Sequence, residues 1–199
     1  MIFKLVLLYT SMNKIFIIEH LEPQVGEWTL IEYTHISKIV GKENLHFTNV
    51  KDLKDRETLS SLGKVSKESV KELGLNDACI LDPESPHLLS PQNARPFKYF
   101  IFGGILGDNP PRKRTQEELT RFIPGLPSFN IGKMQMSTDN AVYTVKKIIE
   151  GTSFDKIKFQ DEVEIRINDV ESTILPYRYA IVKGEPLMSQ DLIKYLKEH

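Results

Sequence analysis

The chain is almost without cysteine: its 199 residues include only one, Cys79. A single cysteine excludes a disulfide within the chain and any metal site built from several cysteines. Cys79 stands in an apolar run at residues 78–81. We therefore expect its side chain to be buried as a small apolar group.

The sequence also lacks an excess of either charge. It contains 26 Lys and Arg against 27 Asp and Glu, for a formal net charge of -1. A broad surface for nucleic acid or for an anionic membrane needs a basic excess. This balance argues against both partners, although it is compatible with a local basic patch.

A long apolar run is missing too. The mostly apolar residues 1–10 are fewer than the roughly 20 that a membrane-spanning helix needs, and no small-residue cleavage pattern follows them. Met12 offers a second start. We expect residues 1–12 to be an extension outside the fold and residues 13–199 to form one domain, and we expect a soluble, cytoplasmic protein with no membrane contact.

The remaining pattern alternates strands with helices. Continuous apolar runs such as residues 15–18 and 99–102 are typical of strands buried on both faces. This alternation predicts an α/β fold with a mainly parallel sheet. We expect strands at 14–18, 45–50, 78–83, 98–102, 128–132, 163–167 and 177–182, and helices at 27–40, 115–118, 138–149 and 189–198, with two short helices in 52–74.

Ligands of parallel sheets bind outside the carboxyl ends of the strands. Four segments should meet there: Glu19-His20, residues 81–83, residues 103–111 and residues 131–139.

The segment 103–111 is a glycine loop that follows an apolar strand. It places glycines at 103, 104 and 107 and then a Pro110-Pro111 pair, which disfavours a helix directly after the loop. A dinucleotide fingerprint would open into a helix, and a phosphate loop would end in Gly-Lys-Ser or Gly-Lys-Thr. The loop alone is equally compatible with an unusual ligand site and with a structural turn.

A second loop, at residues 131–139, favours the ligand site. It again joins a strand to a helix that Thr138 or Asp139 would cap. Two such loops after adjacent strands would form opposite walls of one pocket. Backbone amides there could bind an adenine edge, with Leu106, Ile131, Met134 and Met136 packed on its faces.

Three motifs in order carry a family resemblance. They are FGGILGDNPPR at 102–112, NIGKMQMSTDNA at 130–141 and LPYRY at 175–179, after an opening IIEHLE at 17–22. The chain resembles the SPOUT-class protein-arginine methyltransferases from about residue 13 to its end. The leading dozen residues depart from the resemblance.

The resemblance implies a trefoil-knotted domain that binds S-adenosyl-L-methionine in the knot and methylates an arginine of a small-subunit ribosomal protein. It places the cofactor against residues of three segments. These are Leu81 and Pro83, then Gly103, Gly104, Leu106 and Gly107, and then Ile131, Gly132, Met134, Met136, Ser137 and Thr138.

Methylation of a guanidinium requires a group that holds this planar cation and a group that takes a proton. Carboxylates suit the first task through bidentate hydrogen bonds. We expect Asp108 and Glu19 to hold the guanidinium and His20 to be a candidate base. Glu27, Asp139, Tyr177 and Arg178 are expected substrate contacts, although the position of Asp139 favours a helix cap over a substrate contact and Glu19 could simply end its strand.

Two other functions remain compatible with the sequence. One is a SPOUT methyltransferase of tRNA or rRNA, against which the missing basic excess and the lack of an appended RNA-binding domain argue. The other is a ribosome-associated binding protein without activity. No metal site is expected, nucleic acid is an unlikely partner on charge, and the absence of an obvious apolar dimer face favours a monomer.

Overall fold

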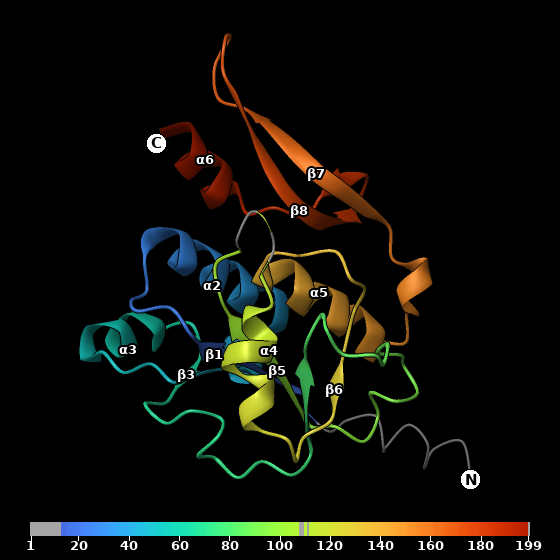
Figure 1. Ribbon diagram of the computed structural model, residues 1–199. Helices are drawn as coiled ribbons and strands as arrows, with labels where there is room; N and C mark the ends of the chain where they lie inside the picture. Colours follow the sequence, from blue (N-terminus) through green and yellow to red (C-terminus); the bar gives the residue numbers. More distant parts are fainter. Residues whose placement is uncertain (1–12, 108–109, 111, 199) are drawn as a thin grey trace, which may run out of the picture.

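The computed structural model describes residues 13–107, 110 and 112–198 (Figure 1). Six strands form one parallel sheet in the order β3-β2-β1-β5-β4-β6. The expected α/β fold with a mainly parallel sheet is confirmed. The strands are β1 (Ile15–His20), β2 (Leu45–Thr48), β3 (Lys64–Val65), β4 (Ala78–Leu81), β5 (Tyr99–Gly104) and β6 (Ser128–Phe129).

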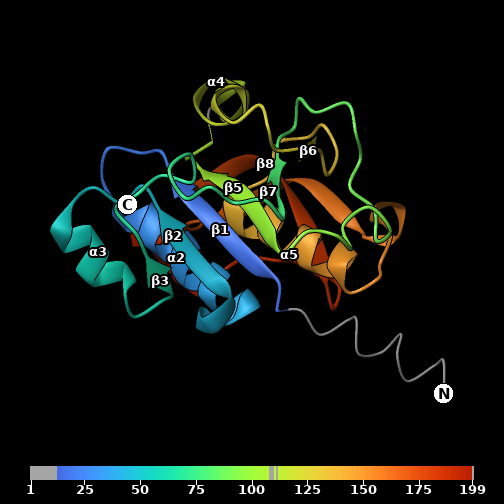
Figure 2. The same cartoon turned by 90° about the horizontal axis from the view of Figure 1, so that it is seen from below.

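The central strands are buried on both faces, as their apolar runs predict. Phe16 and Ile18 of β1 pack in the larger core with α2 (Glu27–Val40) and α5 (Thr138–Ile149). Ile17, which points the other way, packs with residues such as Val70 and Leu119 in a smaller core. Figure 2 shows α2 and α5 behind the sheet, with α4 at its rim. Cys79 of β4 is buried, as expected.

The two long helices match the predicted ranges. Helix α2 ends where Gly41 takes a positive φ of 81° and donates its N–H to Ser37 at 2.9 Å, a conformation that glycine adopts without strain. The N-cap of α5 is Ser137, one residue before the expected Thr138 or Asp139.

Two shorter predictions are wrong. In the segment 52–74 only one α-helix forms, α3 (Leu53–Leu59). The expected second helix is absent because the backbone groups that would form it bond elsewhere. The Ser66 carbonyl accepts the Val50 N–H at 3.1 Å, and the Val70 N–H donates to the Glu19 carboxylate at 3.0 Å. Helix α4 (Arg114–Glu118) starts one residue early, without the expected side-chain cap.

A second, antiparallel sheet was not predicted. It joins β7 (Phe159–Arg166), β8 (Ser172–Val182) and β9 (Glu185–Pro186), and helix α6 (Gln190–Glu198) follows it. Figure 1 shows this sheet stacked beyond α2 and α5, on the side away from the parallel sheet. Short 3₁₀ turns complete the described fold: η1 (Lys42–Asn44), η2 (Thr120–Phe122) and η3 (Phe154–Lys156). None of the helices in the described ranges is both long and apolar enough to cross a membrane.

Burial of His46 on β2 predicts acid sensitivity. Burial, assisted by the nearby Lys64, lowers the pKa of His46 from 6.5 to about 4, so the unfolded chain takes up a proton first. The imidazole therefore contributes stability above pH 6.5 that is lost as the pH falls from 6.5 towards 4. The buried Glu32, whose pKa is raised, acts in the opposite direction: its contribution to stability grows as the pH falls towards 4.5.

The contribution of His46 can be isolated by substitution. Between pH 7 and pH 4.5, we expect wild type to lose about 2 kcal/mol of unfolding free energy relative to His46→Gln, as measured by urea denaturation. His87, an exposed histidine, gives the control His87→Gln. Equal pH dependence of wild type and His46→Gln would contradict this role of His46.

Candidate functional site

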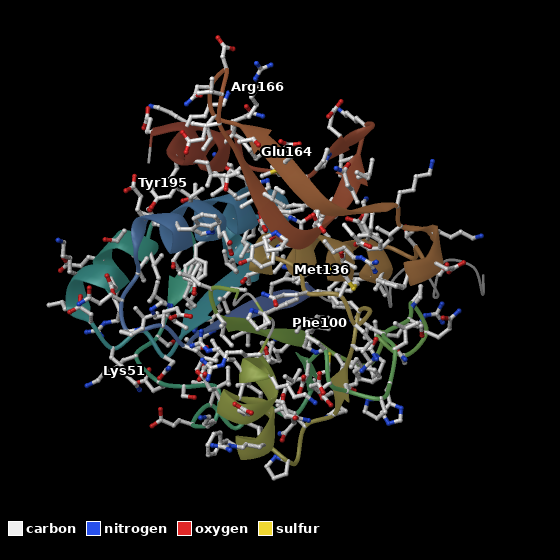
Figure 3. The ribbon with its side chains drawn as sticks, turned by 45° about the horizontal axis from the view of Figure 1, so that its top comes forward. Lys51, Phe100, Met136, Glu164, Arg166 and Tyr195 are labelled. Carbon is white, nitrogen blue, oxygen red and sulfur yellow. The ribbon has the colours of Figure 1, made fainter. Side chains whose placement is uncertain are left out.

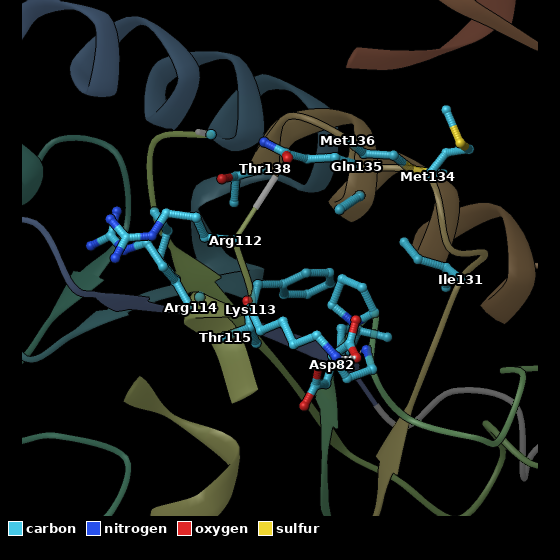
Figure 4. Close-up of a pocket in the computed structure, with 18 of the residues that line it drawn as sticks. Asp82, Arg112, Lys113, Arg114, Thr115, Ile131, Met134, Gln135, Met136 and Thr138 are labelled. Carbon is cyan, nitrogen blue, oxygen red and sulfur yellow. Dashed lines mark hydrogen bonds and ion pairs between the residues drawn. The ribbon is translucent and has the colours of Figure 1, made fainter. Parts of the chain in front are cut away.

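The described part of the chain contains a cavity of about 240 Å³ at the carboxyl ends of β4 and β5. This is slightly below the roughly 300–1,000 Å³ typical of small-molecule sites. Figure 4 shows its walls. The lining residues are Leu81, Asp82, Pro83, Glu84, Phe102, Gly103, Ile105, Leu106, Gly107, Arg112, Lys113, Arg114, Thr115, Ile131, Lys133, Met134, Gln135, Met136, Thr138 and Ala141.

Three of the four segments that the sequence places together line this cavity. They come from residues 81–84, the glycine loop and residues 131–138. Nine of the twelve expected cofactor contacts are among the lining residues: Leu81, Pro83, Gly103, Leu106, Gly107, Ile131, Met134, Met136 and Thr138. The glycine loop and the loop before α5 thus face each other across one space.

The other three expected contacts lie outside the lining. Gly104 is buried, and a Cβ there would lie 2.8 Å from Ile18 Cγ2 and would also collide with the Tyr33 hydroxyl. A Cβ at Gly132 would meet the Phe154 ring at 2.7 Å. Ser137 turns its hydroxyl to Asp139 at 2.6 Å. A substitution of Gly104 would therefore act on the fold rather than on the cavity.

Strand β8 closes the rim beside the glycine loop. The Tyr177 hydroxyl donates to the Gly107 carbonyl at 3.0 Å, and the Arg178 N–H donates to the Gln135 carbonyl at 2.8 Å. A Cβ at Gly107 would lie 2.6 Å from Tyr177 Cε1 and would also collide with the Gln135 amide. Gly107 is therefore a position where the backbone must approach closely, and only glycine permits this.

Four basic residues line the cavity: Arg112, Lys113, Arg114 and Lys133. Lys113 pairs with Glu84 at 2.5 Å, and Lys133 Nζ donates to the Pro83 and Ser85 carbonyls at 2.6 and 3.0 Å. Arg114 is held by carboxylates, and Arg112 forms no ion pair with any described residue. In the view of Figure 4, the guanidinium groups of Arg112 and Arg114 lie on the side of the cavity opposite Ile131.

Glu22 fixes the glycine loop to α4. Its Oε1 accepts the Leu106 N–H at 3.0 Å and Arg114 Nη1 at 2.8 Å, and Arg114 also pairs with Glu118 at 2.7 Å. The carboxylates of Glu118, first, and Glu22 raise the pKa of the Arg114 guanidinium, so that it stays charged. Sequence reasoning missed Glu22, although it stands in the IIEHLE segment; nothing in its spacing indicates its partners.

Glu19 does not line the cavity. Its side chain is fully buried, and its carboxylate accepts the Thr48 hydroxyl at 2.6 Å, the Ser69 hydroxyl and the Val70 N–H at 3.0 Å. These donors occupy both oxygens. The expectation that Glu19 holds a substrate guanidinium is therefore unsupported, and its position fits a structural role that ties the 66–73 segment to β1.

His20 does not line the cavity either. Its Nδ1 lies 2.9 Å from the Tyr33 hydroxyl, and its Nε2 is buried with no partner among the described residues. Burial lowers the pKa of His20, so that the neutral ring is favoured. The geometry therefore gives no support to His20 as the base.

The remaining expected catalytic and substrate residues are scattered. Glu27 opens α2 on the surface, away from the cavity lining. Asp139 is buried and pairs with His35 at 2.6 Å. Arg178 forms a two-pronged pair with Asp161 at 2.5 and 2.8 Å. Tyr177 reaches the rim, and Asp108 lies outside the described residues.

A buried acid lies behind the wall that Thr138 forms. Trp28 Nε1 donates to the buried Glu32 Oε1 at 2.8 Å. Burial, together with the nearby Asp139, raises the pKa of Glu32. Interactions with Trp28 and Thr138 act in the opposite direction and lower this pKa.

The chemistry of the walls suits a flat apolar group with a charged tail. Leu81, Phe102, Ile131 and Met136 offer apolar contact, and the glycine backbones leave space beside them. Arg112 offers a positive charge to the same space. No group of three or more metal-binding side chains occurs within the described ranges.

Comparison with known proteins places the chain near one group of enzymes. The family described as "Protein arginine N-methyltransferase SFM1-like" matches residues 15–199. The protein arginine N-methyltransferase SFM1 of Saccharomyces cerevisiae is 39% identical over 202 residues, which cover 92% of this chain and 94% of the yeast protein.

Solved structures give the same result. The yeast arginine methyltransferase SFM1 complexed with SAM superposes with a TM-score of 0.87 at 36% identity, covering 98% of this chain and 95% of that one. Its complex with SAH gives 0.85, also at 36% identity, with 96% and 97% covered. The dual-specific Trm10 from Thermococcus kodakaraensis shares the fold at 19% identity and a TM-score of 0.59, with 72% and 96% covered.

Proposed function

Because this chain belongs to the SFM1-like family of protein arginine N-methyltransferases, we propose that its cavity binds S-adenosylmethionine (SAM) for methylation of a protein arginine. The observation that carries this proposal is the pair of facing walls, the glycine loop and residues 131–138. We further propose that the substrate is a small-subunit ribosomal protein. Residues 13–199 are proposed to form a single domain with a trefoil knot at these two loops. The protein is proposed to act as a monomer in the cytoplasm.

The walls fit the proposed cofactor. Apolar side chains such as Leu81, Ile131 and Met136 would pack on the adenine faces, and the missing side chain of Gly107 lets the glycine loop lie against Tyr177 and Gln135. When bound, SAM supplies an electrophilic methyl group on a sulfonium centre. The contribution of the chain is to orient the target nitrogen and to exclude water around it.

Calorimetry tests the cofactor site directly. We expect purified wild type to bind SAM and S-adenosylhomocysteine with a stoichiometry of one. Complete lack of binding to either ligand would overturn the proposed function.

Arg112 is proposed to hold the carboxylate of the methionine part of SAM. Among the described residues it is the lining cation without an ion pair, a hydrogen bond or a ring contact from its side chain, and a guanidinium binds a carboxylate through two parallel hydrogen bonds. We expect Arg112→Met to lower the affinity for SAM about tenfold, which corresponds to about 1.4 kcal/mol. Methylthioadenosine lacks this carboxylate, so its affinity should stay unchanged.

Because SAM carries the carboxylate and methylthioadenosine lacks it, measuring both affinities in one calorimetric series gives an internal control. Lys133→Met, which changes a lining cation already bound to backbone carbonyls, serves as the matched variant. Parallel losses of SAM and methylthioadenosine binding in Arg112→Met would contradict a carboxylate contact.

Asp108 remains our proposed holder of the substrate guanidinium. It follows Gly107, which lines the cavity, directly in the sequence, and a carboxylate both orients a guanidinium and favours its cationic form. We expect Asp108→Asn to lower kcat on a protein substrate at least about 100-fold while the SAM affinity changes less than about threefold. Normal turnover by Asp108→Asn would remove this residue from the mechanism.

A further inference from the structure

The β7–β8 hairpin has one covered face and one open face. Its inner face packs Val163, Ile165, Leu175 and Tyr179 against α6 and Trp28. The outer face carries Glu164 opposite Ile174, both exposed. Ile174 is 58% exposed, and Val170 in the turn is 95% exposed. A β-branched side chain left this open on a regular strand lacks a partner within the described fold.

The exposed charges of the hairpin are mostly of one sign. The chain as a whole is nearly neutral, whereas residues 159–182 of the hairpin carry two basic side chains and five acidic ones, and the five acidic ones are all exposed. Both basic side chains are already paired, Arg166 with Asp169 at 3.2 Å and Arg178 with Asp161 at 2.5 Å, so three of the acidic side chains form no ion pair with a described residue. The acidic side chains are Asp161, Glu162, Glu164, Asp169 and Glu171. This surface complements a cationic partner.

The outer face meets the cavity wall at Arg178, which shares this face with Ile174. The N–H of Arg178 donates to the Gln135 carbonyl in the wall, while the preceding Tyr177, which packs on the inner face, donates its hydroxyl to Gly107 in the glycine loop. Ile174 precedes Arg178 by four residues on the same strand, which is about 13 Å at the rise of a β-strand. Figure 1 shows the hairpin leading away from the helices, and Figure 3 shows Glu164 and Arg166 on its outer part.

We propose that the outer face of the β7–β8 hairpin docks the segment of the substrate protein that flanks the target arginine. The segment fitted by this face is basic and carries one apolar side chain that covers Ile174. Its arginine would reach the cavity while flanking residues lie along β8. The inference rests on the proposed function for the identity of the substrate and extends it to how the substrate is chosen.

Two substitutions test the docking face in turnover. At saturating SAM, with small-subunit ribosomal proteins as substrate, we expect Ile174→Asp and Glu164→Lys each to raise KM about five- to tenfold, with kcat and SAM affinity unchanged. The matched controls lie on α3, where Leu53 is 62% exposed and Glu57 is also exposed. Leu53→Asp and Glu57→Lys should leave KM unchanged.

A binding measurement separates this inference from the proposed function. Fluorescence anisotropy would follow a labelled 20-residue peptide with one arginine, flanking lysines and a leucine. Binding by wild type that weakens in Glu164→Lys and Ile174→Asp, but not in the α3 variants, supports the docking face even if no methyl transfer occurs. Unchanged peptide affinity and unchanged KM in the hairpin variants would overturn it, as would absence of peptide binding by wild type.

Discussion

Gly107→Val is expected to lower the affinity for SAM about 100-fold, a loss of about 2.7 kcal/mol. A Cβ at this position would lie 2.6 Å from Tyr177 Cε1 and would collide with the Gln135 amide. The loop would have to move, and the hydrogen bond from the Tyr177 hydroxyl to the Gly107 carbonyl would be lost. Overpacking of this kind costs roughly 1–3 kcal/mol, and here it falls on the cavity wall.

Calorimetry measures the affinity, and thermal denaturation shows that the variant is folded. The matched control is Gly125→Val, because a Cβ at Gly125 meets nothing within 4 Å and the residue does not line the cavity. Wild-type affinity in Gly107→Val would show that the cofactor binds elsewhere.

Glu19→Ala is expected to lower the free energy of unfolding by about 3 kcal/mol. Removal of the carboxylate leaves the Thr48 and Ser69 hydroxyls and the Val70 N–H without their acceptor in a fully buried site. Each unsatisfied buried group costs roughly 1–3 kcal/mol, and the released 66–73 segment offsets part of this by relaxing. Urea denaturation at pH 7 measures the change.

This experiment also distinguishes structure from catalysis. Glu57→Ala, an exposed glutamate on α3, should leave stability within about 0.5 kcal/mol of wild type. If Glu19 instead held the substrate, Glu19→Ala would remain as stable as wild type and lose turnover.

The parallel sheet could be predicted from local pattern. The buried strands β1 and β5 contain continuous apolar runs. Helix α5 has a clear apolar period, α2 carries apolar residues near helical spacing, and a glycine follows each helix. The carboxyl ends of parallel strands share one edge, so the walls at Leu81, Gly107 and Ile131 could be brought together from the sequence.

The antiparallel sheet could not be predicted, because alternation such as Val163-Glu164-Ile165 shows that one face is buried but not against what. Long-range partners were equally hidden. Glu19 and Glu22 are both acids near the end of β1, yet one is fully buried under Ser69 and the other bonds to Leu106 and Arg114. Only the paths of the distant segments decide which acid lies near the cavity.

Methyl transfer from labelled SAM tests the central claim most directly. Wild type would be incubated separately with small-subunit ribosomal proteins and with ribosomal and transfer RNA, followed by acid hydrolysis of the protein and nuclease digestion of the RNA. We predict labelled methylarginine in the protein sample, none in the RNA, and a large loss of label with Gly107→Val. Label in a nucleoside, with none in arginine, would contradict a protein arginine methyltransferase.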